Sequence, residues 1–138
     1  MKTITKNIIL FVIFAITYYC IEVLWRGHSY FAMAIVGGIC GLVIGLSNEQ
    51  IDWDEPLIPH GFHCAIYVTA IEFFSGLILN VFLGLNLWDY SDLPGNVFGI
   101  ICPQFFFAWW ALGIIGTIFD DWLRYVLFGE PMQKYRWI

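Results

Sequence analysis

Charged residues are scarce in this chain of 138 residues, and their scarcity excludes most kinds of soluble protein. Lys, Arg, Asp and Glu together make up 12% of the residues, whereas about a quarter of the residues are charged in an ordinary soluble domain. Hydrophobic residues make up 60%, and the mean hydropathy is +0.76. So apolar a composition favours a membrane protein over a small soluble domain.

Motifs for several kinds of chemistry are also missing. The sequence has no G-x-x-x-x-G-K-[ST] phosphate loop, so it does not encode an ATPase of that type. Its four cysteines, Cys20, Cys40, Cys64 and Cys102, form no C-x-x-C pair that would indicate a zinc site or a redox motif. The sequence also lacks a nucleophile elbow together with Ser, His and Asp in the order typical of a hydrolase. We therefore expect no enzyme activity, no bound metal and no cofactor.

Acids outnumber bases, which gives a net charge of −5. Most of these acids lie in two segments, residues 49–55 and 120–130. An acidic balance of this kind argues against nucleic acid as a partner and against a polybasic segment that binds anionic lipid.

The sequence contains long runs of apolar residues. Four of them lie at about residues 8–25, 30–46, 62–85 and 97–119. Each approaches the ~17–25 residues that cross the core of a bilayer as a helix. Lys2 and Lys6 precede the first run, but no small-x-small cleavage site follows it, so we interpret it as a retained span and not as a signal peptide. The sequence thus predicts an all-α integral membrane bundle of four transmembrane helices in a single domain.

The residues after the fourth run predict a short interfacial helix at the C-terminal end. Trp122, Tyr125 and Val126 can share one face of this helix, and Gly129 and Pro131 would stop it.

The distribution of cations predicts the orientation. With four spans, five of the six Lys and Arg residues fall on the side that holds both termini, and only Arg26 falls on the other. The positive-inside rule then places both termini in the cytoplasm of a cell membrane.

The third run carries an acid in its middle, because Glu72 lies within TAIEFFSGLILN. At 3.6 residues per turn, Thr69, Ser75, Gly76 and Asn80 share its side of the helix. An ionisable group that faces lipid is costly, so this polar stripe should face the bundle interior or a water-filled cavity. Two interpretations stay open. A neutral Glu72 can donate a hydrogen bond to a carbonyl and join helices, or Glu72 can serve in the transport of a proton or a substrate.

A second acid, Glu22, lies near the outer end of the first run, and Arg26 follows it at i+4, the favourable order for a helical ion pair. Because no other Lys or Arg is expected on that side, Glu22, Asp89 and Asp92 compete for one partner. We predict that Arg26 pairs with Glu22 or with an acid of the loop, either as an interfacial pair or as part of a binding site.

Two patterns leave the packing of the helices open. Gly37, Gly41 and Gly45 recur every four residues and permit close approach of another helix, either within the bundle or at a seam between two copies. Pro103 either kinks a helix that begins at Val97 or itself begins the helix, with the preceding residues partly re-entrant.

A metal site in the loop between the second and third runs has little support. His60 and His63 stand near Asp52, Asp54 and Glu55, but their spacing matches no standard ligand set. We interpret them as interfacial histidines beside a solvated acidic loop.

Several short motifs resemble those of a known family. They are YCIEV in the first run, Arg26-Gly27 before the second, TAIEFFSG in the third, and then LWDYS and PGNVFGIIC. In these motifs the chain resembles the small membrane proteins described as "putative ABC-transporter type IV", which include animal transmembrane proteins of unknown role. The family often has a second acid near the position of Asn80 and an Arg in G-R-I-C, where this chain has Gly99-Ile100-Ile101-Cys102. The resemblance therefore implies a lost ion pair and a simplified site.

The resemblance also implies a permease-like protein that moves a small solute or ion past an intramembrane acid. A separate ATPase subunit would be needed if transport uses ATP. The candidate binding residues are Glu72, Glu22, Arg26, Asn80, Ser75, Thr69 and Asp89. The alternative is a non-transporting membrane scaffold or accessory subunit, in which these residues only hold helices together. The expected partners are the lipid bilayer and further copies of the chain in a homo-oligomer.

Overall fold

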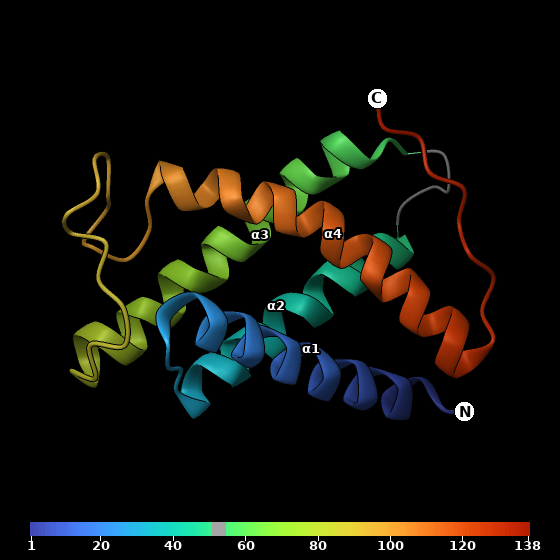
Figure 1. The fold of residues 1–138 in the computed structure, drawn as a ribbon, viewed down its shortest axis with the longest axis horizontal. Coiled ribbons are helices and arrows are strands. Elements are labelled where there is room, and N and C mark those ends of the chain that lie inside the picture. The colour runs from blue at the N-terminus through green and yellow to red at the C-terminus, as the bar shows by residue number, and fades with distance from the viewer. Residues whose placement is uncertain (51–54) are drawn as a thin grey trace.

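A computed structural model of the chain describes residues 1–50 and 55–138 and consists of long helices (Figure 1). These are α1 (Thr3–Arg26), α2 (Phe31–Gln50), α3 (Leu57–Gly76) and α4 (Pro103–Phe128), and a π-helical segment, η1 (Leu77–Phe82), continues α3. Within the two described ranges there is no β-strand, and Val97 and Ile101 form an isolated bridge. The long loop between η1 and α4 lies at one end of the molecule (Figure 1).

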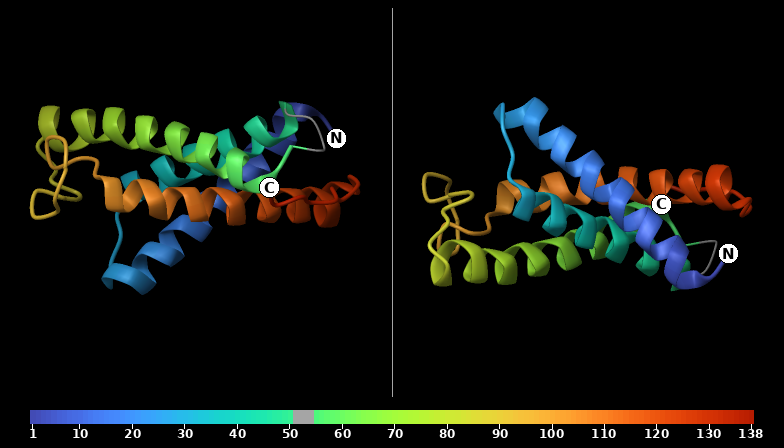
Figure 2. Two further views of the ribbon diagram at one scale, coloured as in Figure 1. Left: turned by 90° about the horizontal axis from the view of Figure 1, so that it is seen from above. Right: turned by 90° about the horizontal axis from the view of Figure 1, so that it is seen from below.

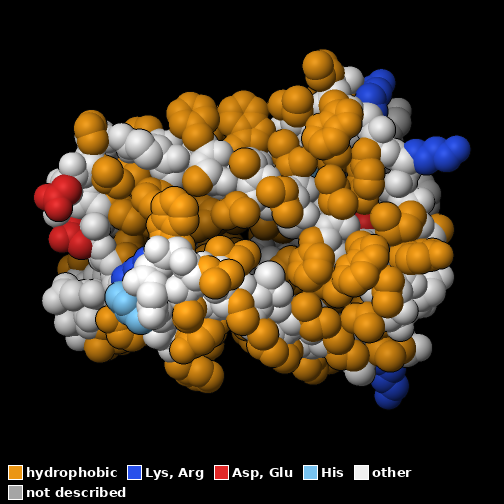
Figure 3. Space-filling view, viewed as in Figure 1, with side chains coloured by type: hydrophobic (Ala, Val, Ile, Leu, Met, Phe, Trp, Pro, Cys, Tyr) orange, Lys and Arg blue, Asp and Glu red, His pale blue; other side chains and the backbone are white. Residues whose placement is uncertain are grey.

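Among the described residues, four helical segments, with α3 and η1 taken together, are long and apolar enough to cross a membrane. Large hydrophobic side chains are exposed along them, among them Ile16, Ile35, Phe74 and Ile115. Apolar side chains cover most of the face in Figure 3, and most of the charged side chains visible there lie near its ends. The predicted all-α bundle of four transmembrane helices is confirmed.

The bundle consists of two helical hairpins, α1 with α2 and α3 with α4. Both termini lie at one end (Figure 2), where Lys6 Nζ lies 3.1 Å from Glu130 Oε1. The hairpins meet near that end, where Phe14 of α1 packs edge-on against Phe119 of α4 with ring centroids 5.7 Å apart. Toward the loop end α1 diverges from α4 (Figure 2), and a cleft lies between the two helices.

The glycines of α2 are used inside the bundle. A side chain at Gly37 would collide with Tyr18, and one at Gly41 would collide with Phe14, both on α1. Gly45 faces α4 in the same way. Of the two alternatives for this glycine face, the structure therefore shows close packing within one chain.

The boundaries of α4 differ from the predicted span of residues 97–119. The helix begins at Pro103, whose missing N–H has no partner to lose at the first helical position. Residues 97–102 before it are not helical. The expected interfacial segment is helical and ends at Gly129, which has a φ of 70°, but it forms the last turns of α4 and is not a separate helix.

The start of α3 corrects the interpretation of the histidines. Because α3 begins at Leu57, His60 lies inside the helix and is 1% exposed, with Nε2 3.5 Å from Cys64 Sγ. His60 is thus a buried residue of α3 and does not belong to the loop in which the sequence placed it. His63 Nδ1 lies 3.7 Å from Glu55 Oε1. The other two acids considered with them, Asp52 and Asp54, lie outside the described residues.

The C-terminal residues 129–138 return across the end of the bundle and cap α3. The carbonyls of Arg136 and Trp137 accept hydrogen bonds from the N–H groups of Leu57 and Ile58, at 2.7 and 3.1 Å. These N–H groups belong to the first turn, which has no acceptors within its own helix. The Tyr135 hydroxyl donates to Asp121 Oδ2 at 2.6 Å on α4. Burial, together with this acid, raises the pKa of Tyr135.

Candidate functional site

Glu72 lies in the second half of α3 and is 7% exposed. Both of its carboxylate oxygens accept hydrogen bonds. Oε1 accepts from the Tyr90 hydroxyl at 2.8 Å, and Oε2 accepts from the Trp109 indole N–H at 2.9 Å. Glu72 therefore joins α3 to the loop and to α4 as an acceptor of two hydrogen bonds, whereas the helix-joining interpretation had it donate to a carbonyl.

A cavity of about 310 Å³ lies beside Glu72. Residues from all four helices line it, including Phe14, Tyr18 and Trp109, and Trp88 of the loop lines it as well. Glu72 is the single acid among these lining residues, and none of them is Lys, Arg or His. Within the described part of the chain, Glu72 has no ion-pair partner. An acid in an apolar cavity without a countercharge is suited to holding a proton or a cation.

A second cavity, of about 610 Å³, shares a wall with the first. The shared residues are Tyr18, Ile21, Met33, Trp88, Trp109 and Leu112. Glu22, Arg26 and Asp89 also line this second cavity, which therefore carries the charged groups of the loop end. The two cavities together bring four of the predicted site residues into one region.

Arg26 ties α1 to the loop. Its Nη1 lies 2.6 Å from Glu22 Oε1, and its Nη2 donates to the Leu87 carbonyl at 2.9 Å. The predicted ion pair is thus confirmed. The second oxygen of Glu22, Oε2, is buried and has no hydrogen-bond partner among the described residues. Asp89 is exposed and accepts from the Ser91 N–H at 2.8 Å, and this bond lowers the pKa of Asp89.

Asn80 holds the loop against η1. Its Oδ1 accepts from the Leu87 N–H at 2.7 Å, and its Nδ2 donates to the Trp88 carbonyl at 3.1 Å. The Trp88 indole in turn donates to the Ile100 carbonyl at 3.0 Å, and Ile100 packs against Gly76 of α3. These contacts fold the loop back over the helices and place Trp88 in the wall between the cavities.

The same fold of the loop places Tyr90 between α4 and Glu72. Its ring stacks on Phe105 of α4 with centroids 4.5 Å apart, and its hydroxyl reaches Glu72. Burial, together with the Glu72 carboxylate, raises the pKa of Tyr90. Its hydroxyl therefore stays a hydrogen-bond donor at ordinary pH.

The remaining candidate residues lie apart from the cavities. Thr69 and Ser75 line neither cavity. The Thr69 hydroxyl is buried and has no partner among the described residues. The residues of the polar stripe predicted on α3 thus do not face one common site, because Glu72 faces the cavity and Asn80 faces the loop.

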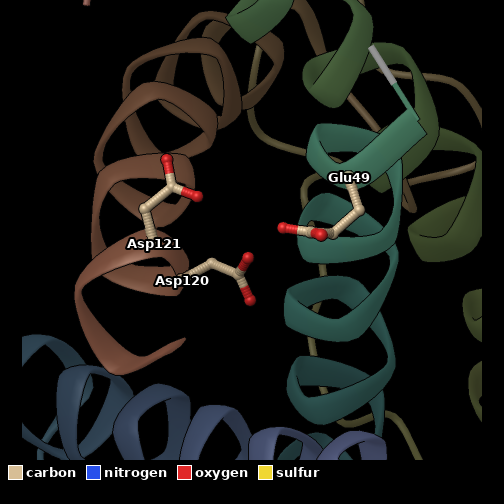
Figure 4. A group of neighbouring side chains, drawn as sticks. All are labelled: Glu49, Asp120 and Asp121. Carbon is tan, nitrogen blue, oxygen red and sulfur yellow. The ribbon is translucent and has the colours of Figure 1, made fainter. Parts of the chain in front are cut away.

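A second group of polar side chains lies at the end of the bundle that holds the termini. Figure 4 shows Glu49 of α2 and Asp120 of α4 pointing toward one another, with Asp121 beside them, and one oxygen of each lies within 4.8 Å of the others. Arg124 Nε lies 2.8 Å from Asp120 Oδ2 and 3.5 Å from Glu49 Oε1. Asn48 Nδ2 donates to Asp121 Oδ1 at 2.7 Å. Because Arg124 supplies the countercharge, we interpret this group as a network that joins α2 to α4.

Long apolar helices whose outer sides are also apolar define a multi-pass membrane protein. A family model described as "Putative ABC-transporter type IV" matches residues 9–127 of the chain. The chain belongs to this family, which confirms the resemblance indicated by its motifs. No curated protein and no solved structure matches the chain.

Proposed function

We propose that this chain is a permease-like protein of a cell membrane, in which a small solute or ion passes Glu72. The observation that carries the proposal is the position of Glu72 on the wall of a 310 Å³ cavity without a cationic partner among the described residues. Acids inside a membrane are costly, and they mark ion and substrate pathways when they face a cavity. A carboxylate in this position can exchange a proton for another cation.

The proposal extends to energy and orientation. A separate ATPase subunit supplies the energy if transport uses ATP, because the chain lacks a phosphate loop. The chain itself carries out no reaction on the solute.

Both termini lie in the cytoplasm, in agreement with the distribution of Lys and Arg. The substitutions Asp92→Cys and Lys2→Cys are made singly in a variant without native cysteines. The cysteine at position 92 should react with an impermeant reagent added outside, and the cysteine at position 2 with the reagent added inside. The reverse pattern would overturn this orientation.

The function is tested with purified protein in proteoliposomes on a solid-supported membrane. The measurement is the transient current after a jump in pH, Na⁺, K⁺ or a small organic cation. Glu72→Gln keeps the size of the side chain and can still bond Tyr90 and Trp109, but it cannot titrate. We expect the current in the wild type and its loss in this variant at equal folded yield.

A matched control is Asp92→Asn, which removes an acid that is exposed on the loop and lines neither cavity. The control should give the wild-type current. Equal traces from the wild type, Glu72→Gln and Asp92→Asn for every cation would favour the alternative, a non-transporting scaffold or accessory subunit in which Glu72 only joins α3 to the loop and to α4.

A further inference from the structure

We propose that the two joined cavities bind a hydrophobic organic cation, which enters sideways between α1 and α4 and places its charge against Glu72. This inference rests on the proposed function and names the chemical class of its substrate. It follows from the lining of the cavities, their charge and their opening.

The lining suits an organic ligand better than a bare metal ion. The cavities, of about 310 and 610 Å³, fall in the range of about 300–1,000 Å³ that holds drug-sized molecules. The rings of Tyr18, Trp88 and Trp109 stand in their common wall, and aromatic faces attract cations. A hard metal ion needs about six oxygen ligands, whereas Glu72 supplies the single carboxylate that the described residues bring to the first cavity. A cation with an apolar body needs no such shell.

The charge of the lining selects a cation. Three acids, Glu72, Glu22 and Asp89, line the two cavities together with one cationic side chain, Arg26. Arg26 binds only one oxygen of Glu22, and Oε2 of this acid is buried without a hydrogen-bond partner among the described residues. Among the described residues, the lining therefore has more acids than bases, and an anionic ligand would meet an excess of negative charge in both cavities.

The opening faces the side of the bundle. Ile21, Leu24 and Trp25 of α1 line the second cavity and are also 45%, 87% and 81% exposed, so they form its rim. Figure 3 shows a hollow between the side chains of α1 and those of α4 on the largely apolar face. Hydrophobic cations dissolve in bilayers, and a ligand of this class can therefore reach Glu72 directly from the lipid.

The test uses two ions of nearly the same shape and opposite charge. Tetraphenylphosphonium and tetraphenylborate are titrated by calorimetry into the whole chain in detergent, with empty micelles as the baseline. We expect saturable binding of tetraphenylphosphonium to the wild type and to Asp92→Asn, and none of tetraphenylborate. Glu72→Gln should weaken the binding by about 10- to 100-fold, which is the usual effect of removing one charged partner. Glu72→Asp keeps the charge and should retain most of the affinity.

Three results would overturn the inference. They are binding of tetraphenylphosphonium no stronger than in empty micelles, equal binding of both ions, and equal affinity in the wild type and Glu72→Gln. Each variant is first shown to have the helical circular dichroism of the wild type. If the phosphonium ion does not bind but Glu72-dependent currents with protons or inorganic cations persist, this inference fails and the proposed function stands. If those currents are absent as well, both fail.

Discussion

Replacing Gly41 by alanine should force α1 and α2 apart. A methyl group at this position would overlap the Cβ atom and the ring of Phe14. Phe14 is 7% exposed and packs against Phe119, and the overlap involves the root of its side chain, so a change of rotamer does not relieve it. Overpacking of a dense core costs about 1–3 kcal/mol, and the better helix propensity of alanine returns about 0.5–1 kcal/mol. We expect a net loss of about 0.5–2 kcal/mol of unfolding free energy.

Gly116→Ala is the matched control for this substitution. Gly116 lies in α4, and a Cβ atom there would meet Ile44 at 3.6 Å, which is an ordinary van der Waals contact. This variant should keep the stability of the wild type or gain up to about 1 kcal/mol. The assay is thermal unfolding in one detergent, followed by circular dichroism. Equal melting of the two alanine variants, or a Gly41→Ala variant more stable than the wild type, would refute the close approach of α1 and α2.

Two further predictions concern the end of the bundle that holds the termini. Arg124→Gln should destabilise the protein by about 3–5 kcal/mol in the same melts, because it leaves Asp120, which is 0% exposed, without its countercharge. Adding Asp120→Asn to this variant should restore part of the loss, and no restoration would contradict the pairing. Because folding raises the pKa of Tyr135 above its ordinary 10.0, the stability that its protonated hydroxyl provides is present below about pH 10 and is lost as the pH rises further. Tyr135→Phe should therefore lose less stability than the wild type above that pH, and parallel pH profiles for the two proteins would contradict this.

The features that the sequence predicted correctly are those set by local spacing. The lengths of the apolar runs predict the four helices, because a helix that crosses a bilayer must bond its backbone internally. The i+4 spacing of Glu22 and Arg26 predicts their ion pair, since the two side chains lie one turn apart. The four-residue spacing of Gly37 and Gly41 predicts a close helix contact, although only the structure identifies α1 as the partner.

The features that sequence reasoning missed depend on how distant segments meet. Tyr90 is part of the loop motif LWDYS, and Trp109 is one of two adjacent tryptophans in an apolar run, so nothing in the sequence marked either as a partner of Glu72. Their positions follow from a loop that folds back over α3, with positive φ angles at Asn86 and Phe98 that side-chain patterns do not predict. The start of α3 at Leu57 was missed for a similar reason, because its cap comes from the last residues of the chain.

The π-helical segment η1 has a consequence for comparing chains of different length. An α-helix turns about 100° per residue, so a side chain eight residues after Glu72 would point about 80° away from it. In η1 the bonds reach five residues back, as from the Leu83 N–H to the Ile78 carbonyl, so each residue turns by less and Asn80 comes closer to the side of Glu72. A chain with one residue fewer in η1 could form a regular α-helix and place its amide seven residues after the acid, on the same face. A one-residue gap in an alignment of relatives is therefore better placed inside η1 than in the loop that follows it.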